Sequence, residues 1–187
     1  QDLDEMFNPF YITSNDSIMN AFIVVNCKFI NLGAKTRILR VNAASNSVVK
    51  KFVFSGNYIE NFGGNLGEGV HGQTFMQWNA ATPGYEFDDI TISDNSIMGW
   101  HGNIFFNWGG QKLTNKDSLI NITIANNIFY KFGGNGASVR NFIEWTNNMG
   151  GVGANININK NIFYKNWEAK HYKNFRLHLF TPKDSIQ

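Results

Sequence analysis

The sequence predicts an all-β solenoid, a parallel β-helix of about five coils with three strands in each coil. Nearly the same motif recurs after 30 to 38 residues. Every copy has a polar residue, mostly asparagine, at the same place. Each copy also contains three short apolar segments separated by corners. A stack of such copies buries a continuous core that no single copy could form.

Each copy begins with a segment in which apolar side chains alternate with small or polar ones. A period of two residues is typical of a β-strand, whereas a helix would show a period of 3.6. The apolar pairs are Phe52/Phe54, Ile90/Ile92, Ile122/Ile124 and Ile156/Ile158. The first copy begins at Phe22 and reads FIVVNCKFINLG. We therefore expect one strand at the start of every copy.

The recurring polar residue follows this strand and is asparagine in four of the copies. The shared position holds Cys27, Asn57, Asn95, Asn127 and Asn161. An asparagine at one corner of every coil can hydrogen-bond to its neighbours above and below. The sequence thus predicts a structural ladder of asparagines that satisfies the backbone of the turn. We expect Cys27 to end this ladder as a small, buried and inert thiol.

Two further segments complete each copy. The second follows the polar residue, and its apolar side chains are Ile59 and Phe62, Ile97 and Trp100, Phe129 and Phe132, and Phe163 and Trp167. The third segment reads ILRVN from Ile38, FMQWN from Phe75, FFNWG from Phe105, FIEWT from Phe142 and RLHLF from Arg176. Residues 10–12, FYI, are expected to add another strand of this third kind. A helical solenoid is disfavoured, because asparagine, glycine and β-branched residues at these positions oppose helix.

Composition places the chain among folded proteins and excludes several classes of partner. The 187 residues are enough for one domain, and 43% of them are hydrophobic. The net charge of +2 gives no reason to expect nucleic acid, and no apolar run is long enough to span a membrane. An open solenoid end exposes strand edges. We therefore expect residues 1–187 to form a single β-helix domain within a longer multidomain protein, or to be covered at one end by a partner.

The repeated φ-x-φ-x-x-Asn-x-φ units and the asparagine column resemble the right-handed parallel β-helix proteins of the pectate-lyase-like superfamily. The chain also looks like β-helix domains of secreted and surface proteins from Bacteroidetes. The resemblance implies that the strand before the asparagine belongs to sheet two, the strand after it to sheet three, and the third segment to sheet one. In pectate lyases the outer face of sheet one forms the substrate groove. The resemblance also implies an extracellular, cell-surface or periplasmic location.

The third segments predict which side chains of sheet one point into the core. Every second residue of these segments is apolar in every copy, so we expect these residues to point into the core. These residues are Leu39/Val41, Met76/Trp78, Phe106/Trp108, Ile143/Trp145 and Leu177/Leu179. The opposite parity gives an outward polar column of Arg40, Gln77, Asn107, Glu144 and His178. Beside it we expect an outward apolar column of Ile38, Phe75, Phe105 and Phe142.

A row of outward phenylalanines marks a contact surface on a folded protein. One interpretation is a polysaccharide platform, with aromatic rings against sugar C–H groups and polar side chains on hydroxyls or carboxylates. The predicted substrate-binding residues are Phe75, Gln77, Phe105, Asn107, Arg140, Phe142 and Arg176. The other interpretation is a structural or adhesive segment whose phenylalanines pack against loops, another domain or a partner.

Catalysis is a further alternative, because Arg40, Glu144 and His178 could serve a polysaccharide lyase that acts on a pectin-like or other acidic glycan. An ordinary cross-strand ion pair between Glu144 and His178 explains the same residues. No cluster of carboxylates suited to calcium stands on this face. His71 and His101 lie at equivalent Gly-rich corners with Glu68 nearby, and the two histidines are better explained as turn caps than as metal ligands. We predict no metal site and no cofactor.

Overall fold

The computed structural model describes strands and turns spread along the whole chain. The described residues are 9–12, 18–31, 38–43, 48–60, 74–80, 86–99, 104–109, 119–130, 141–146, 153–164 and 176–179. Within these ranges the chain is all-β, and none of the described residues is helical. The strands are joined in parallel pairs throughout, as the repeated motif predicts.

The strands form three sheets, which we name A, B and C. Sheet A contains β1 (Phe10–Ile12), β5 (Leu39–Ala43), β8 (Thr74–Ala80), β11 (Ile104–Gly109), β14 (Asn141–Thr146) and β17 (Arg176–Leu179). Sheet B contains β2 (Ile18–Met19), β3 (Phe22–Val25), β6 (Val48–Ser55), β9 (Glu86–Ser93), β12 (Leu119–Ala125) and β15 (Gly153–Asn159). Sheet C contains β4 (Lys28–Ile30), β7 (Tyr58–Glu60), β10 (Ser96–Met98), β13 (Ile128–Tyr130) and β16 (Ile162–Tyr164).

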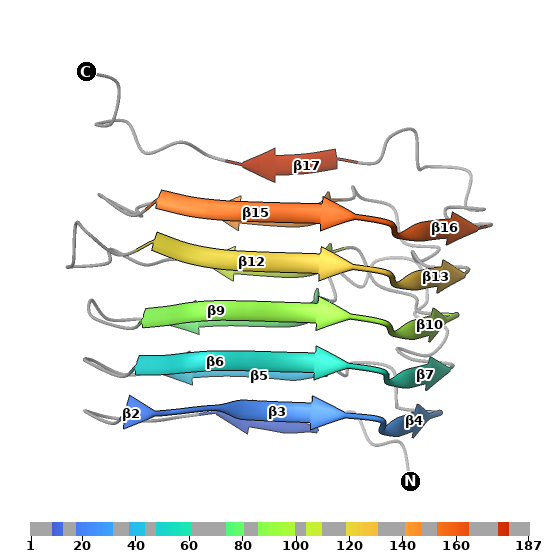
Figure 1. Ribbon diagram of the computed structural model, residues 1–187, viewed down its shortest axis with the longest axis horizontal. Helices are drawn as coiled ribbons and strands as arrows, with labels where there is room; N and C mark the ends of the chain where they lie inside the picture. Colours follow the sequence, from blue (N-terminus) through green and yellow to red (C-terminus); the bar gives the residue numbers. More distant parts are fainter. Residues whose placement is uncertain are drawn as a thin grey trace, which may run out of the picture.

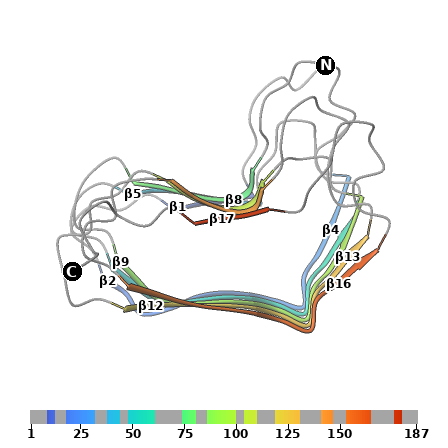
Figure 2. The same cartoon turned by 90° about the horizontal axis from the view of Figure 1, so that it is seen from above.

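The chain visits the sheets in the fixed order A, B, C, and each visit adds one strand beside the previous one. Figure 1 shows the strands of sheet B stacked in order, with sheet C continuing each of them after a bend. Seen from above, the strands of each sheet lie over one another on three sides (Figure 2). Sheets A, B and C correspond to the predicted sheets one, two and three. We call a strand of sheet B, the following strand of sheet C and the preceding strand of sheet A a layer, because these three lie at one level (Figure 1).

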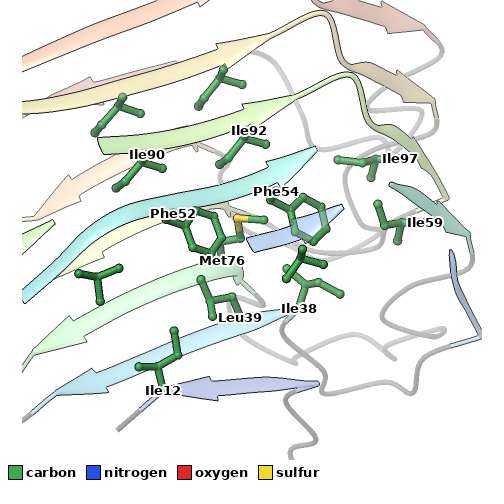
Figure 3. Close-up of a cluster of buried hydrophobic side chains, with 14 of the residues drawn as sticks. Ile12, Ile38, Leu39, Phe52, Phe54, Ile59, Met76, Ile90, Ile92 and Ile97 are labelled. Carbon is green, nitrogen blue, oxygen red and sulfur yellow. The ribbon is translucent and has the colours of Figure 1, made fainter. Parts of the chain in front are cut away.

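Burial follows the alternation of apolar residues in the inner layers. Phe52, Phe54, Ile90, Ile92, Ile122 and Ile124 of sheet B are each at most 1% exposed. Ile59, Ile97 and Phe129 of sheet C are 0% exposed. They meet Leu39 and Met76 of sheet A in one apolar cluster, part of which Figure 3 shows. Such burial is the main favourable term in folding, so the stacked apolar rows hold the three sheets together.

The predicted asparagine ladder is confirmed at the bend between sheets B and C. The side-chain oxygen of Asn95 accepts hydrogen bonds from the backbone N–H of Asn57 at 2.9 Å and from its amide at 3.0 Å. Asn127 receives the same pair from Asn95, and Asn161 receives it from Asn127. Each amide also donates to a backbone carbonyl of the layer below, for example from Asn57 to Val24 at 3.0 Å. The ladder thus pairs the buried polar groups of a sharp bend.

The residue before each ladder position has a left-handed backbone conformation. These residues are Asn26 (φ 54), Gly56 (φ 67), Asp94 (φ 58), Asn126 (φ 57) and Lys160 (φ 52). Glycine, asparagine and aspartate tolerate this conformation better than other residues do. One left-handed residue in every layer therefore turns the chain from sheet B into sheet C.

Cys27 ends the ladder, but the prediction that it is buried is wrong. Its backbone N–H donates to the side-chain oxygen of Asn57 at 2.9 Å, as the ladder requires. The thiol is exposed, because Cys27 belongs to the first layer and no described residue covers the bend from below. Among the described residues, its Sγ donates to the carbonyl of Val25 alone, at 3.4 Å. The ladder therefore ends at a residue that is open to solvent.

Phe10 covers the core at the N-terminal end of the stack. Its ring contacts Phe22 and Phe29 edge-on, with centroid distances of 5.6 and 5.8 Å. β1, which carries it, pairs in parallel with β5, so the predicted additional strand of sheet A is confirmed. In the next layer Phe52 and Phe54 stack above Phe22 and Phe29. The first layer is thus closed by an aromatic side chain from sheet A.

Candidate functional site

The register of sheet A brings the predicted polar column into one line. Arg40 is paired with Gln77, Gln77 with Asn107, Asn107 with Glu144, and Glu144 with His178. Tyr11 of β1 is the register partner of Arg40 and extends the line by one strand. Neighbouring strands of a sheet lie about 4.8 Å apart. Six residues, one from each strand, therefore follow one another at one register position across sheet A.

The described side chains at the N-terminal end of the sheet show which parity faces outward. Ile12, Leu39 and Met76 are 6%, 1% and 0% exposed and belong to the core. Tyr11, on the opposite parity, is 50% exposed. Arg40 is half-buried beside it. The column therefore lies on the outer face of sheet A at this end. The side chains of Gln77, Asn107, Glu144 and His178 lie outside the described part of the structure.

Tyr11 is a member of the column that the sequence pattern did not identify. The Arg40 guanidinium carbon lies 5.9 Å from the centre of the Tyr11 ring, which is within the range of a cation–π contact. In the sequence Tyr11 stands between Phe10 and Ile12, so the alternation along the strand already places it on the outer face. An exposed aromatic ring beside an arginine offers an apolar face and a positive charge next to one another.

Arg40 carries an unpaired polar atom. Its Nε is buried and has no hydrogen-bond partner. An arginine has five N–H donors in a fixed planar arrangement and suits planar anionic groups such as carboxylates. Burial of a donor without a partner costs free energy. Arg40 therefore gives the N-terminal end of the column a positive charge and a donor geometry that suits a carboxylate.

The register places three members of the predicted apolar column at one level, and burial contradicts the fourth. Phe75, Phe105 and Phe142 lie between two rows of register partners, Thr74–Ile104–Asn141 and Met76–Phe106–Ile143. Their side chains lie outside the described part of the structure. Ile38, the predicted first member, is 0% exposed and belongs to the core, so that prediction is wrong. It immediately precedes β5, at a bend where the alternation of inner and outer side chains has not yet begun.

Arg176 occupies a different register position from the one predicted. The repeat places it beside Phe142, but it is paired with Asn141. The register shifts between Asn141 and Ile143, so β14 has one more residue there than β17. Such a bulge places two residues of one strand opposite one residue of its partner. After it, Glu144 and His178 return to the predicted pairing. The predicted Arg140 lies outside the described residues.

The register separates the three predicted catalytic residues into two groups. Glu144 and His178 are direct partners on neighbouring strands. Arg40 lies three strands away from Glu144, with Gln77 and Asn107 between them. Three strand spacings amount to about 14 Å between backbones. Arg40 and the Glu144–His178 pair are therefore placed to contact different parts of an extended ligand.

Several other predictions fall outside the described residues, among them His71, His101 and Glu68. Within the part of the chain that is described, no group of three or more His, Cys, Asp or Glu side chains could hold a metal ion. No helix long and apolar enough to cross a membrane occurs in that part either.

Comparison with known proteins gives no family for this chain. No protein-family model matches it, and neither a curated protein nor a solved structure matches it.

Proposed function

We propose that this chain is a secreted or cell-surface bacterial module that binds a polysaccharide along the outer face of sheet A. In this proposal the three sheets close into a right-handed parallel β-helix of the pectate-lyase-like kind, with Arg40 favouring an acidic, pectin-like glycan. The polysaccharide lies across the strands and contacts one side chain of the column in each layer. The phenylalanines of the neighbouring column supply apolar contacts to the sugar rings.

The single observation that supports this proposal is the six-strand register of the polar column. Tyr11, Arg40, Gln77, Asn107, Glu144 and His178 follow one another without interruption. A core-forming sheet needs apolar residues only on its inner parity. A continuous line of amide, charged and aromatic residues at one register position suits a linear ligand that repeats hydroxyl or carboxylate groups. Loops or a partner over this face would instead favour the structural interpretation.

The test is retention on immobilised neutral and acidic polysaccharides, with the soluble fraction analysed by mass spectrometry for new chain ends. Retention on an acidic glycan that is lost in the double variant Gln77→Ala/Asn107→Ala is the expected result. Each lost hydrogen bond should weaken binding by about threefold to tenfold. The matched control is Thr123→Ala on the outer face of sheet B, which should not change retention. Unchanged retention in the double variant would exclude this face.

The same assay separates binding from catalysis. A lyase would release unsaturated uronic-acid ends, and Glu144→Gln or His178→Ala would then abolish product formation. Retention without new chain ends identifies a binding module. We favour binding, because Arg40 is about 14 Å from Glu144 along the sheet and the three residues do not form one compact centre.

A second candidate function is a structural or adhesive segment, and one observation favours it. Four apolar residues on the first layer are exposed, and they are Ile18 (68%), Ile23 (56%), Val25 (44%) and Ile30 (41%). In the next layer the register partners of Ile23, Val25 and Ile30 are Val53, Ser55 and Glu60. Large exposed apolar side chains that gather in one layer favour contact with another surface.

This alternative is tested by giving the first layer the outer residues of a later one. The variant Ile23→Thr/Val25→Ser copies Thr91 and Ser93 of β9. If the first layer is a contact surface, this variant binds less hydrophobic dye than the unchanged chain. In this case neither protein is retained on any of the immobilised polysaccharides. Retention that survives the same substitutions supports the polysaccharide proposal instead.

A further inference from the structure

Tyr11 and Arg40 form a pair on the outer face of sheet A. They are register partners on β1 and β5, which lie on the same side of the stack (Figure 2). The Arg40 guanidinium carbon lies 5.9 Å from the centre of the Tyr11 ring, and Tyr11 is 50% exposed. Ile12 and Leu39, the next residues along the two strands, are buried in the core. The pair therefore stands outside the core, beside the register position of Gln77.

The charge of Arg40 is not compensated within the described part of the chain. Its buried Nε has no hydrogen-bond partner, and no carboxylate of the described residues forms an ion pair with it. Buried donors are nearly always paired, so an unpaired one calls for an explanation. A guanidinium stays charged in proteins, and its planar set of donors suits a carboxylate. Because Arg40 is only half-buried, a carboxylate of a bound molecule can approach it from solvent.

The Tyr11 ring restrains the position of this guanidinium. An arginine side chain has many rotamers and loses conformational entropy when it is held in one of them. Contact with an aromatic ring is one way to hold it, since a ring attracts a cation without supplying a carboxylate or carbonyl oxygen to its donors. A charged group that is already held in place loses less entropy when a ligand binds. The ring therefore prepares Arg40 for a ligand and leaves its charge uncompensated.

We propose that Tyr11 is a specificity-determining residue of the outer face of sheet A, which holds the Arg40 guanidinium in place to select free carboxylate groups over esterified ones. This inference rests on the proposed function and deepens it, because the choice of an acidic glycan is assigned to one pair of side chains. Arg40 contacts the carboxylate, and Tyr11 acts through Arg40 as a positioning residue. Esterification removes the negative charge, and a hydrogen bond to a neutral acceptor is weaker than one to a carboxylate.

A second cation–ring pair in the chain lacks this property. Lys28 lies over the Tyr58 ring at 5.4 Å, but Tyr58 donates its hydroxyl to the carboxylate of Glu60 at 2.9 Å. A negative charge therefore already stands beside this pair, and a carboxylate of a ligand would be repelled by it. The pair lies on sheet C, away from the proposed binding face. Tyr58 therefore supplies a matched control for Tyr11.

The experiment measures the affinity of the full chain for polygalacturonate and for the same polymer after methyl esterification. The unchanged chain should bind the free acid more tightly than the ester. Arg40→Gln should weaken binding of the free acid by at least about tenfold and leave binding of the ester nearly unchanged. Tyr11→Leu should weaken binding of the free acid by about twofold to fivefold, whereas Tyr11→Phe keeps the ring and should behave as the unchanged chain does.

The double variant Tyr11→Leu/Arg40→Gln separates positioning from a direct contact between the ring and the ligand. If Tyr11 acts through Arg40, the double variant binds the free acid no more weakly than Arg40→Gln alone. Tyr58→Leu, the matched control, should leave both affinities unchanged. The ratio of the two affinities is measured on one preparation of each variant, so it does not depend on the fraction of that variant that is folded.

Three results would overturn this inference and leave the proposed function standing. They are equal affinity of the unchanged chain for the free acid and the ester, an affinity ratio for Tyr11→Leu equal to that of the unchanged chain, and a further loss of affinity in the double variant. Failure of the unchanged chain to bind either polymer also overturns the inference. The panel of neutral and acidic polysaccharides then decides whether the proposed function fails with it.

Discussion

The side-chain oxygen of Asn127 accepts two hydrogen bonds from Asn95, one from the backbone N–H at 3.0 Å and one from the side-chain amide at 2.9 Å. The same amide donates to the carbonyl of Phe54 in the layer below at 3.0 Å. Asn95 is 1% exposed, so water does not replace these partners. Each asparagine therefore satisfies groups in two neighbouring layers, and the loss of one leaves buried groups unpaired on both sides.

The first prediction follows from this arrangement. Asn95→Ala should lower the free energy of unfolding by about 2–4 kcal/mol, because the backbone N–H of Asn57 and the carbonyl of Phe54 lose their partners in a buried site. Urea denaturation followed by circular dichroism measures the change. The control is Asn157→Ala on the exposed outer face of β15, which should cost less than about 0.5 kcal/mol. Equal costs for the two variants would show that the ladder is not a source of stability.

The second prediction concerns the left-handed residue of the second layer. Gly56 has φ 67, and a Cβ at this position would meet the side-chain oxygen of Asn26 in the layer below. Gly56→Ala should therefore lower the free energy of unfolding by about 1–3 kcal/mol. The double variant Gly56→Ala/Asn26→Gly removes the clash but keeps the strained φ. In a thermal melt it should be less stable than Asn26→Gly alone, and equal stability of these two variants would mean that the backbone conformation of residue 56 costs nothing.

The third prediction uses the same position in the last layer. Lys160 has φ 52, a conformation that costs an ordinary L-residue about 1–2 kcal/mol. Lys160→Gly should raise the urea midpoint, with a gain of up to about 1 kcal/mol because glycine also loses more entropy on folding. Lys160→Ala is the comparison, and it should leave the midpoint nearly unchanged. A gain in both variants would trace the effect to the lysine charge instead.

The strand order of the fold and the register of sheet A could be predicted from the sequence because they depend on a period that the chain repeats. Inner and outer rows, the asparagine ladder and the strand at Phe10–Ile12 all follow from aligning the copies on one polar residue. Alternation in a strand is strictly of period two. For this reason the line from Arg40 to His178 could be predicted across strands far apart in the sequence.

The features that were missed lie where the period ends. Cys27 is exposed because a first layer has no layer below it, and the pattern of the repeat contains no information on its own ends. Ile38 is buried because it stands at a bend, where neighbouring side chains do not alternate. The shift that pairs Arg176 with Asn141 is a bulge, in which β14 has one residue more than β17. The types of the residues in the two strands do not indicate it. None of these departures alters the spacing of the copies.

The fourth prediction extends the ladder at its lower end. Cys27 already donates its backbone N–H to the side-chain oxygen of Asn57, but its thiol makes only a weak contact with the carbonyl of Val25. An asparagine here can donate its amide to Asn57 as the higher rungs do, so Cys27→Asn should raise the free energy of unfolding by about 0.5–1.5 kcal/mol. Cys27→Ala removes the thiol without adding the amide and should be nearly neutral. A gain with alanine equal to that with asparagine would contradict the ladder explanation.

The fifth prediction concerns pH and the outer face of sheet C. Tyr58 donates its hydroxyl to the carboxylate of Glu60 at 2.9 Å, and Lys28 lies over its ring at 5.4 Å. The hydrogen bond to Glu60, followed by partial burial and the negative charge of Glu60, raises the pKa of Tyr58 above its ordinary value of about 10. The pKa is higher in the folded chain than in the unfolded one. The stabilisation is therefore complete below about pH 10 and is lost as the pH rises through the raised pKa.

Ultraviolet difference spectra of the tyrosinate band, recorded for the unchanged chain and for Tyr58→Phe, isolate the titration of Tyr58 from those of the other tyrosines. Glu60→Gln should shift this titration down toward the ordinary tyrosine value, because it removes both the charged acceptor and the negative charge. Lys28→Met tests the second neighbour and should raise the pKa further, since a positive charge near the ring favours tyrosinate. If Glu60→Gln leaves the titration unchanged, the hydrogen bond is not its cause.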